Sequence, residues 1–134
     1  MSEFAVTVQV GDLAGRQFID VTALVDTGSS FTFLPTGMLD QLGIEPVGLA
    51  DFEMANESVE RYPIGHARMR LEEQERIVPV VFGPENIEPL LGVTALEIFL
   101  LAVDPINHRL IPVRGRLKYL LQAADEAEHL WTGN

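Results

Sequence analysis

Cysteine is absent from the sequence, which excludes disulfide bonds, zinc sites built on thiolates and catalysis by a cysteine nucleophile. Basic residues are scarce, because nine Lys and Arg stand against twenty Asp and Glu and give a formal net charge of −11. Such a charge repels nucleic acids and anionic lipid surfaces, so neither is an expected partner. The apolar run from Ile98 to Val103 is far shorter than the roughly 20 residues that cross a bilayer. We therefore expect a soluble, cytoplasmic protein with no nucleic-acid and no membrane partner.

Several motifs that carry chemistry are also missing. The histidines, His66, His108 and His129, show no spacing typical of metal ligands. The sequence contains neither a glycine-rich phosphate loop nor the Gly-x-Ser-x-Gly elbow of a serine hydrolase. We therefore expect no metal and no cofactor.

The composition fits one folded domain. The chain has 134 residues, of which 47% are hydrophobic and 22% charged, so we expect a single domain over residues 1–134 with one modest core. Apolar residues alternate with polar ones over residues 4–10 and 19–25, the period of half-buried strands in a hairpin. Pro79 lies in the apolar segment 77–82 and predicts an edge strand or a bulge there.

Short helices and further hairpins complete the pattern. Pro35 and Thr36 begin a short helix that Gly43 ends, and residues 93–99 predict a second one. Residues 49–72 and 101–113 are typical of hairpins with polar turns. The sum predicts a mostly β fold, a small closed β-barrel with one or two short helices. The tail fits either a helical stripe or a final strand that another chain covers; its apolar residues are Leu117, Leu120, Leu121, Ala124 and Trp131.

One acidic residue stands directly after an apolar strand, in the segment Leu24–Phe31, LVDTGSSF. Desolvating a carboxylate costs several kcal/mol, so Asp26 is expected to be hydrogen-bonded or used in chemistry. Gly28 places a backbone amide beside the carboxylate, Thr27 offers a hydroxyl for a bond across a symmetry axis, and we expect the Ser29 hydroxyl to orient the carboxylate. The alternative is an ordinary turn, in which Asp, Gly and Ser are common.

The order of segments resembles the retropepsin-like aspartic proteases, the single-domain, retroviral-type branch. An apolar strand, Asp26-Thr27-Gly28-Ser29-Ser30, a second apolar strand, a hairpin with a polar tip, and Leu90-Leu91-Gly92 before a short helix follow one another as in that family. The resemblance covers residues 4–113. It implies a barrel of the acid-protease type in a homodimer, with no cofactor.

The resemblance also implies roles for single residues. Asp26 matches the catalytic aspartate, Thr27 the threonine that bonds across the dimer axis, and Gly28 the glycine whose backbone contacts substrate. Ser29 departs from the retroviral type, which usually has Ala there, and resembles the two-lobed pepsin-like enzymes. Leu90, Leu91 and Gly92 match the second motif, which lies beside the active site.

The expected flap, the hairpin that closes over substrate, lacks the Gly-rich tip of retroviral flaps, and Glu57 adds negative charge where a substrate would enter. The residues assigned to this flap and to substrate binding are Met54, Ala55, Asn56, Glu57, Ser58 and Val59.

The chemistry of this family needs two carboxylates that share one proton. One activates a water molecule as general base, while the other, protonated, polarises the scissile carbonyl. A chain with one Asp-Thr-Gly provides that pair only through two-fold symmetry, so the hypothesis is a homodimeric aspartic endopeptidase acting on peptide or protein substrates. Residues 114–134 are then a C-terminal tail at the dimer interface. The alternative hypothesis is a catalytically silent dimer of the same fold, which serves as a peptide-binding or oligomerisation module.

Overall fold

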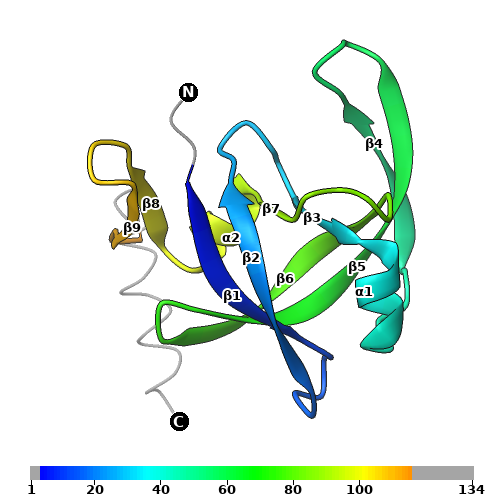
Figure 1. The fold of residues 1–134 in the computed structure, drawn as a ribbon, viewed down its shortest axis with the longest axis horizontal. Helices are drawn as coiled ribbons and strands as arrows, with labels where there is room; N and C mark the ends of the chain where they lie inside the picture. The colour runs from blue at the N-terminus through cyan, green and yellow to red at the C-terminus, as the bar shows by residue number, and fades with distance from the viewer. Residues whose placement is uncertain (1–3, 116–134) are drawn as a thin grey trace, which may run out of the picture.

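The computed structural model describes residues 4–115, and Figure 1 shows how their strands and helices are arranged. The tail from residue 116 onward, for which the sequence left helix and interface strand open, lies outside the described residues. In chain order the elements are β1 (Ala5–Gly11), β2 (Phe18–Val25), β3 (Thr32–Pro35), α1 (Thr36–Gln41), β4 (Gly48–Glu53), β5 (Val59–Leu71), β6 (Gln74–Gly83), β7 (Leu90–Leu91), α2 (Val93–Ile98), β8 (Leu101–Asp104) and β9 (Arg109–Pro112). The predicted mostly β fold with short helices is confirmed.

One sheet contains most of the strands, in the order β1-β2-β7-β3-β6-β5-β4. Strand β1 also pairs with β5, through Gln9–Gly11 opposite Arg68–Arg70, so the sheet closes into a ring and β4 lies outside it. The alternating pattern of residues 4–25 forms the β1–β2 hairpin, in which Ala5 pairs with Leu24 and Gly11 with Phe18.

Strand β6 corrects one expectation. It lies between β3 and β5 and is not an edge strand, although it contains Pro79. The parallel pairing with β3 begins at Val80, opposite Thr32, so Pro79 stands just before the segment in which β6 has partners on both sides. A proline, which has no amide hydrogen to donate, is accommodated at that position.

The core lies inside the ring of strands and is built from the alternating apolar residues. Both short helices contribute to it, because Leu39 of α1 and Leu96 of α2 are buried against the strands. Phe99, which follows α2, is also buried. Among residues 4–115, no helix is long and apolar enough to span a bilayer.

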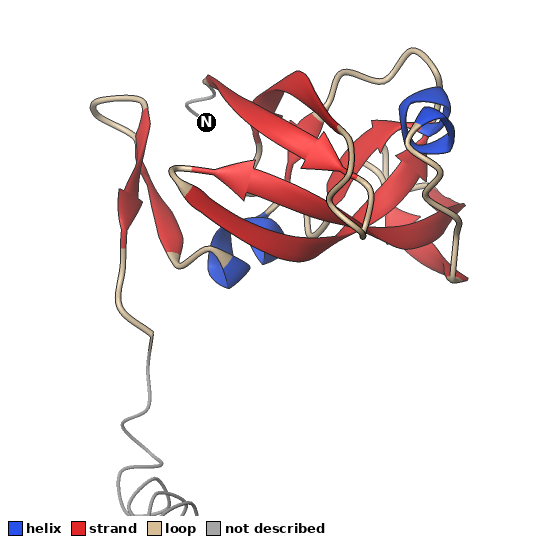
Figure 2. Ribbon diagram, turned by 90° about the horizontal axis from the view of Figure 1, so that it is seen from below, coloured by secondary structure: helices blue, strands red, loops and turns tan. Residues whose placement is uncertain are grey.

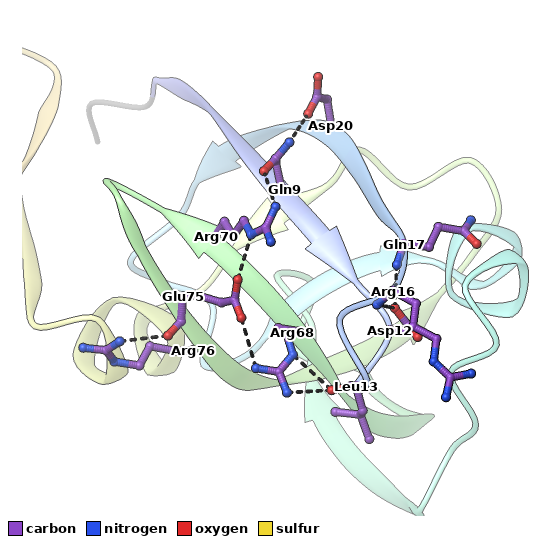
Figure 3. A network of polar contacts seen from close by, with 10 residues as sticks. All are labelled: Gln9, Asp12, Leu13, Arg16, Gln17, Asp20, Arg68, Arg70, Glu75 and Arg76. Atoms are coloured by element: carbon purple, nitrogen blue, oxygen red, sulfur yellow. Dashed lines mark hydrogen bonds and ion pairs between the residues drawn. The ribbon is translucent and has the colours of Figure 1, made fainter.

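A polar network covers the outer face where β1 meets β5 (Figure 3). Glu75 of β6 accepts hydrogen bonds from the guanidinium groups of Arg68, at 3.1 Å, and Arg70, at 2.7 Å, and these bonds hold the pKa of Glu75 below its ordinary value. Arg68 also donates to the carbonyl of Leu13. Arg70 lies 3.6 Å from the ring centroid of Phe18 in a cation–π contact. These contacts stabilise the pairing that closes the ring.

The β8–β9 hairpin forms a separate two-stranded sheet, which stands apart from the main sheet in Figure 2. Its turn is organised by Asp104, whose carboxylate accepts hydrogen bonds from the side chain and amide of Asn107, from Arg109 and from the amide of Ile106. The Asn107 side-chain bond is the largest of the causes that lower the pKa of Asp104 to about 2.

Candidate active site

Asp26 follows the last residue of β2 and is partly exposed. Its amide donates a hydrogen bond to the carbonyl of Leu91 at 3.0 Å. Strand β7 continues this contact, because Leu24 and Val25 pair in parallel register with Leu90 and Leu91. The predicted second motif therefore lies directly beside the predicted catalytic aspartate.

A tight turn after β2 positions the carboxylate. The amide of Gly28 donates to Asp26 Oδ1 at 2.9 Å, as the sequence predicts, and the amide of Ser29 donates to the carbonyl of Asp26 at 3.1 Å. Thr27 and Gly28, at the tip of this turn, are both exposed in the single chain.

The expected role of Ser29 is corrected by its hydrogen bond. The Ser29 hydroxyl donates to the carbonyl of Phe31 at 2.7 Å. A hydroxyl has one proton to donate, so this proton is not shared with the carboxylate of Asp26. Ser29 thus shapes the turn through the backbone two residues ahead.

Strand β7 runs between the strands on both sides of this turn. Leu90 pairs with Leu24 of β2 and with Phe33 of β3. Gly92 follows and is buried where a Cβ atom would lie 2.9 Å from the carbonyl oxygen of Ser29 and closer still to that of Phe31. Only glycine fits there without a shift of the backbone.

The first residues of α2 also hold this turn through backbone hydrogen bonds. The amides of Val93 and Thr94 donate to the carbonyls of Ser29, at 2.8 Å, and Ser30, at 3.0 Å. The amide of Gly92 donates to the hydroxyl of Thr32 at 3.1 Å. Consecutive amides at the start of the helix thus fix the backbone that carries Asp26.

A cleft of about 820 Å³ lies between this turn and the β4–β5 hairpin, which extend toward the same side of the molecule in Figure 1. Of the predicted flap residues, Met54 and Ala55 line it, whereas Asn56, Glu57, Ser58 and Val59 form the tip and the returning strand. The cleft is lined by Asp26, Gly28, Ser29, Ser30, Phe31, Phe33, Ala50, Asp51, Phe52, Glu53, Met54, Ala55, Ile87 and Leu90.

The hairpin tip is a hydrogen-bonded turn without glycine. The amide of Met54 donates to the carbonyl of Ser58 at 2.8 Å, and that of Glu57 donates to the carbonyl of Met54 at 2.9 Å. The carboxamide oxygen of Asn56 accepts bonds from both the amide and the hydroxyl of Ser58. Glu57 has a φ of 68°, in the left-handed region that favours glycine.

Aromatic residues of the cleft were not among the predicted site residues. Phe52 of β4 lies across the cleft from the Asp26 turn, with ring centroids 5.8 Å from Phe31 and 5.2 Å from Phe33, both edge-to-face. Tyr62 completes the cluster at 5.8 Å from Phe33. The signal in the sequence was the alternation of Ala50, Phe52 and Met54, which places Ala50 and Phe52 on one face of β4, with Met54 following directly after the strand.

Charges of one sign line the cleft. Asp26, Asp51 and Glu53 are among its lining residues, and none of the lining residues is basic. Asp51 is paired with Arg61 of β5 at 2.8 Å, and the hydrogen bond from this guanidinium lowers the pKa of Asp51. Within residues 4–115, no group of three or more His, Asp or Glu is placed to hold a metal ion.

Comparison with known families agrees with this geometry. The family model of the aspartyl proteases matches residues 6–95, which include both the Asp26 turn and Gly92. The chain belongs to the aspartyl protease family. No curated protein matches it.

Two solved structures of viral proteases share the fold of this family member. The EIAV protease complexed with the inhibitor HBY-793 is 14% identical and has a TM-score of 0.53, over 81% of this chain and 92% of the viral one. The foamy viral protease–reverse transcriptase, in complex with an RNA/DNA hybrid, is 12% identical and has a TM-score of 0.51, over 92% of this chain and 14% of that one. The aspartic protease family predicted from the sequence is confirmed, and the mostly β fold is shared with these viral proteases.

Proposed function

We propose that this aspartyl protease family member is a homodimeric endopeptidase in which each subunit contributes one Asp26. The observation that carries the proposal is the position of Asp26, partly exposed in the wall of a cleft and held by backbone hydrogen bonds on both sides. One chain contains one Asp-Thr-Gly, so a second copy is needed to provide the second carboxylate. Residues 1–134 form the single domain of each subunit in this proposal.

Two Asp26 carboxylates that share one proton perform the reaction. The ionised carboxylate takes a proton from a water molecule, whose oxygen attacks the carbonyl carbon of the scissile peptide bond. The protonated carboxyl hydrogen-bonds to the carbonyl oxygen and stabilises the negative charge that develops there. The tetrahedral intermediate then collapses, the C–N bond breaks, and the leaving amine takes up a proton from the pair. We expect activity to be highest at acidic to mildly acidic pH, where the pair retains one proton.

The neighbouring residues support this pair. The exposed hydroxyl of Thr27 is available to a partner subunit across the two-fold axis, and the exposed backbone of Gly28 is available to substrate. Ser29 supports the turn through its bond to Phe31. Leu90, Leu91 and Gly92 hold the turn through the pairing of β7 with β2 and through backbone hydrogen bonds.

The β4–β5 hairpin acts as the flap in this proposal. Met54 and Ala55 contact the substrate, and residues 56–59 form the tip of the covering hairpin. The tail from residue 114 onward contributes to the dimer interface.

The decisive variant is Asp26→Asn, which removes the general base and keeps the shape of the side chain. We expect it to abolish cleavage of a pool of fluorescence-quenched peptides, with the fold and the dimer unchanged by circular dichroism and sedimentation. Asp40→Asn, which removes the same charge from the exposed face of α1, is the matched control and retains activity. Cleavage by purified Asp26→Asn protein at the wild-type rate would disprove the assignment.

Binding of a transition-state mimic distinguishes the enzyme from a catalytically silent, peptide-binding dimer. A statine-type peptide carries a hydroxyl where the tetrahedral intermediate forms, and an assembled pair of carboxylates binds it more tightly than the matched peptide without the hydroxyl. For the enzyme we expect the statine-type peptide to raise the melting temperature of the wild type more than the matched peptide does. An equal shift with both peptides supports the silent dimer.

A further inference from the structure

The loop between β2 and β3 is tied at both ends to one dipeptide. At its beginning, the amide of Asp26 donates to the carbonyl of Leu91 at 3.0 Å. At its end, the hydroxyl of Thr32 accepts a hydrogen bond from the amide of Gly92 at 3.1 Å. Leu91 and Gly92 are adjacent, so a single peptide unit fixes the separation of the two ends of the loop that carries Asp26.

Thr32 is unusual in its surroundings. Its side chain is 1% exposed, and it is the buried polar residue among those that the structure describes. A buried hydroxyl is costly unless it is hydrogen-bonded, and here its partner is a backbone amide 60 positions further along the chain. Removing the hydroxyl leaves the Gly92 amide without that acceptor in a dry environment.

The contact at Gly92 is continued by the next two residues. Helix α2 has glycine at its N-cap and no side-chain cap, and its first amides instead donate to the loop, from Val93 to Ser29 and from Thr94 to Ser30. A displacement of Gly92 therefore moves all of these donors together. The hydroxyl of Thr32 is the side-chain group that fixes the first of them.

We propose that Thr32 is a positioning residue of the active site. Through the amide of Gly92 it fixes the loop that carries Asp26, and in the dimer it thereby sets the separation of the two Asp26 carboxylates. This inference rests on the proposed protease function. Thr32 is not among the residues that line the cleft, so it affects the rate of turnover and not the binding of substrate.

The test compares two substitutions that differ in one chemical group. Thr32→Val keeps the shape of the side chain and removes the hydroxyl, whereas Thr32→Ser keeps the hydroxyl and removes the methyl group. Because small displacements of catalytic groups strongly reduce rates, we expect Thr32→Val to lower kcat about 10–100-fold, with KM changed less than about twofold. Thr32→Ser is expected to retain most of the wild-type kcat.

The pH dependence provides a readout that a loss of stability does not produce. The two limbs of the bell-shaped rate profile are separated by the interaction between the two carboxylates, which weakens as they move apart. We therefore expect the pH range between the two limbs of the rate profile to be narrower for Thr32→Val than for the wild type. Val8→Ala, which opens a space in the core at β1, is the control, and it should lower the melting temperature while kcat and the bell stay unchanged.

A second variant covers the case in which Thr32→Val does not fold. Thr32→Ala also lacks the hydroxyl but leaves space in which water can bind the Gly92 amide, and the same fall in kcat with unchanged KM is expected. If the wild type cleaves peptides and either folded variant without the hydroxyl keeps the wild-type kcat and bell, the role of Thr32 is disproved and the protease function stands. A wild type that cleaves no peptide disproves both proposals.

Discussion

The two sides of the cleft are held in different ways. The turn at Asp26 is fixed by buried backbone: strand β7 lies between β2 and β3, Gly92 has no room for a side chain, and the first amides of α2 donate to the turn. The opposite side is β4, an edge strand whose ladder partner is β5. Residues 59–63 of β5 pair with β4 on one side, and the pairing of β5 with β6 on the other side begins only at Ile64.

This difference predicts where the molecule resists change. Buried backbone contacts open only with a large part of the fold, whereas an exposed hairpin opens locally at a lower free energy. The hairpin is connected to the opposite side mainly by aromatic contacts, from Phe52 to Phe31 and Phe33. A protease must hold its catalytic group in place and also admit a peptide. The rigid turn at Asp26 suits the first requirement, and the separately stabilised β4–β5 hairpin suits the second.

The largest effect is expected at Gly92. In Gly92→Ala the new methyl group would lie 2.9 Å from the carbonyl oxygen of Ser29 and closer to that of Phe31, so the backbone must move. We expect the free energy of unfolding to fall by about 3 kcal/mol, as measured by urea denaturation, and cleavage to be lost.

Gly48 provides the matched glycine on the other side of the cleft. It begins β4, and a Cβ atom there would meet only Ile64, at 4.0 Å. Gly48→Ala is expected to change the unfolding free energy by less than about 1 kcal/mol. Equal losses in the two variants would contradict the proposed contrast between the fixed turn and the hairpin.

An intermediate effect is expected at Phe52. Phe52→Ala removes edge-to-face contacts with Phe31 and Phe33, and we expect a loss of about 2 kcal/mol of stability. Amide hydrogen exchange should become faster in β4 and in the hairpin tip, while the amides of Asp26 and Val93 keep their protection. KM should rise more than kcat falls, because Phe52 lines the cleft without contributing to the hydrogen bonds around Asp26. Faster exchange at Asp26 as well would show that the two sides are not independent.

The smallest effect concerns the exposed ion pair between Asp51 of β4 and Arg61 of β5. The hydrogen bond from Arg61 lowers the pKa of Asp51 below 3.8, so the pair contributes to stability above about pH 4 and that contribution is lost as the pH falls through the lowered pKa. Both side chains are exposed, and such pairs contribute little. The melting temperatures of the wild type and Asp51→Asn should differ slightly at pH 6, and the difference should shrink as the pH falls below 3.8. A difference that stays constant over that range would assign another role to Asp51.

Much of the frame could be read from the sequence. The alternation in residues 4–25 predicted the β1–β2 hairpin, and the pairing of Asp-Thr-Gly with Leu90-Leu91-Gly92 predicted a contact between distant segments that the structure contains. The first signal is a local pattern whose physical meaning does not depend on the rest of the chain, whereas the second was implied by the resemblance to the retropepsin-like proteases.

Other features depend on contacts that a single sequence does not specify. Pro79 indicated an edge strand or a bulge, yet β6 lies between β3 and β5. The proline is tolerated because the pairing with β3 begins one residue later, at Val80. The donor proton of Ser29 goes to Phe31 and not to the carboxylate, since the tight turn brings that carbonyl within reach. The aromatic contacts of Phe52 join segments far apart in the chain, so only the folded geometry identifies them.

The most direct test of the central claim, that two subunits each contribute one Asp26, is a mixing experiment. Wild-type and Asp26→Asn chains are combined in varied proportions at constant total concentration, allowed to exchange subunits, and assayed with a fluorescence-quenched peptide. If each active site needs both aspartates and the subunits assort at random, activity falls with the square of the wild-type fraction. Activity that falls in direct proportion to the wild-type fraction, with subunit exchange verified by mass spectrometry, would contradict the shared active site.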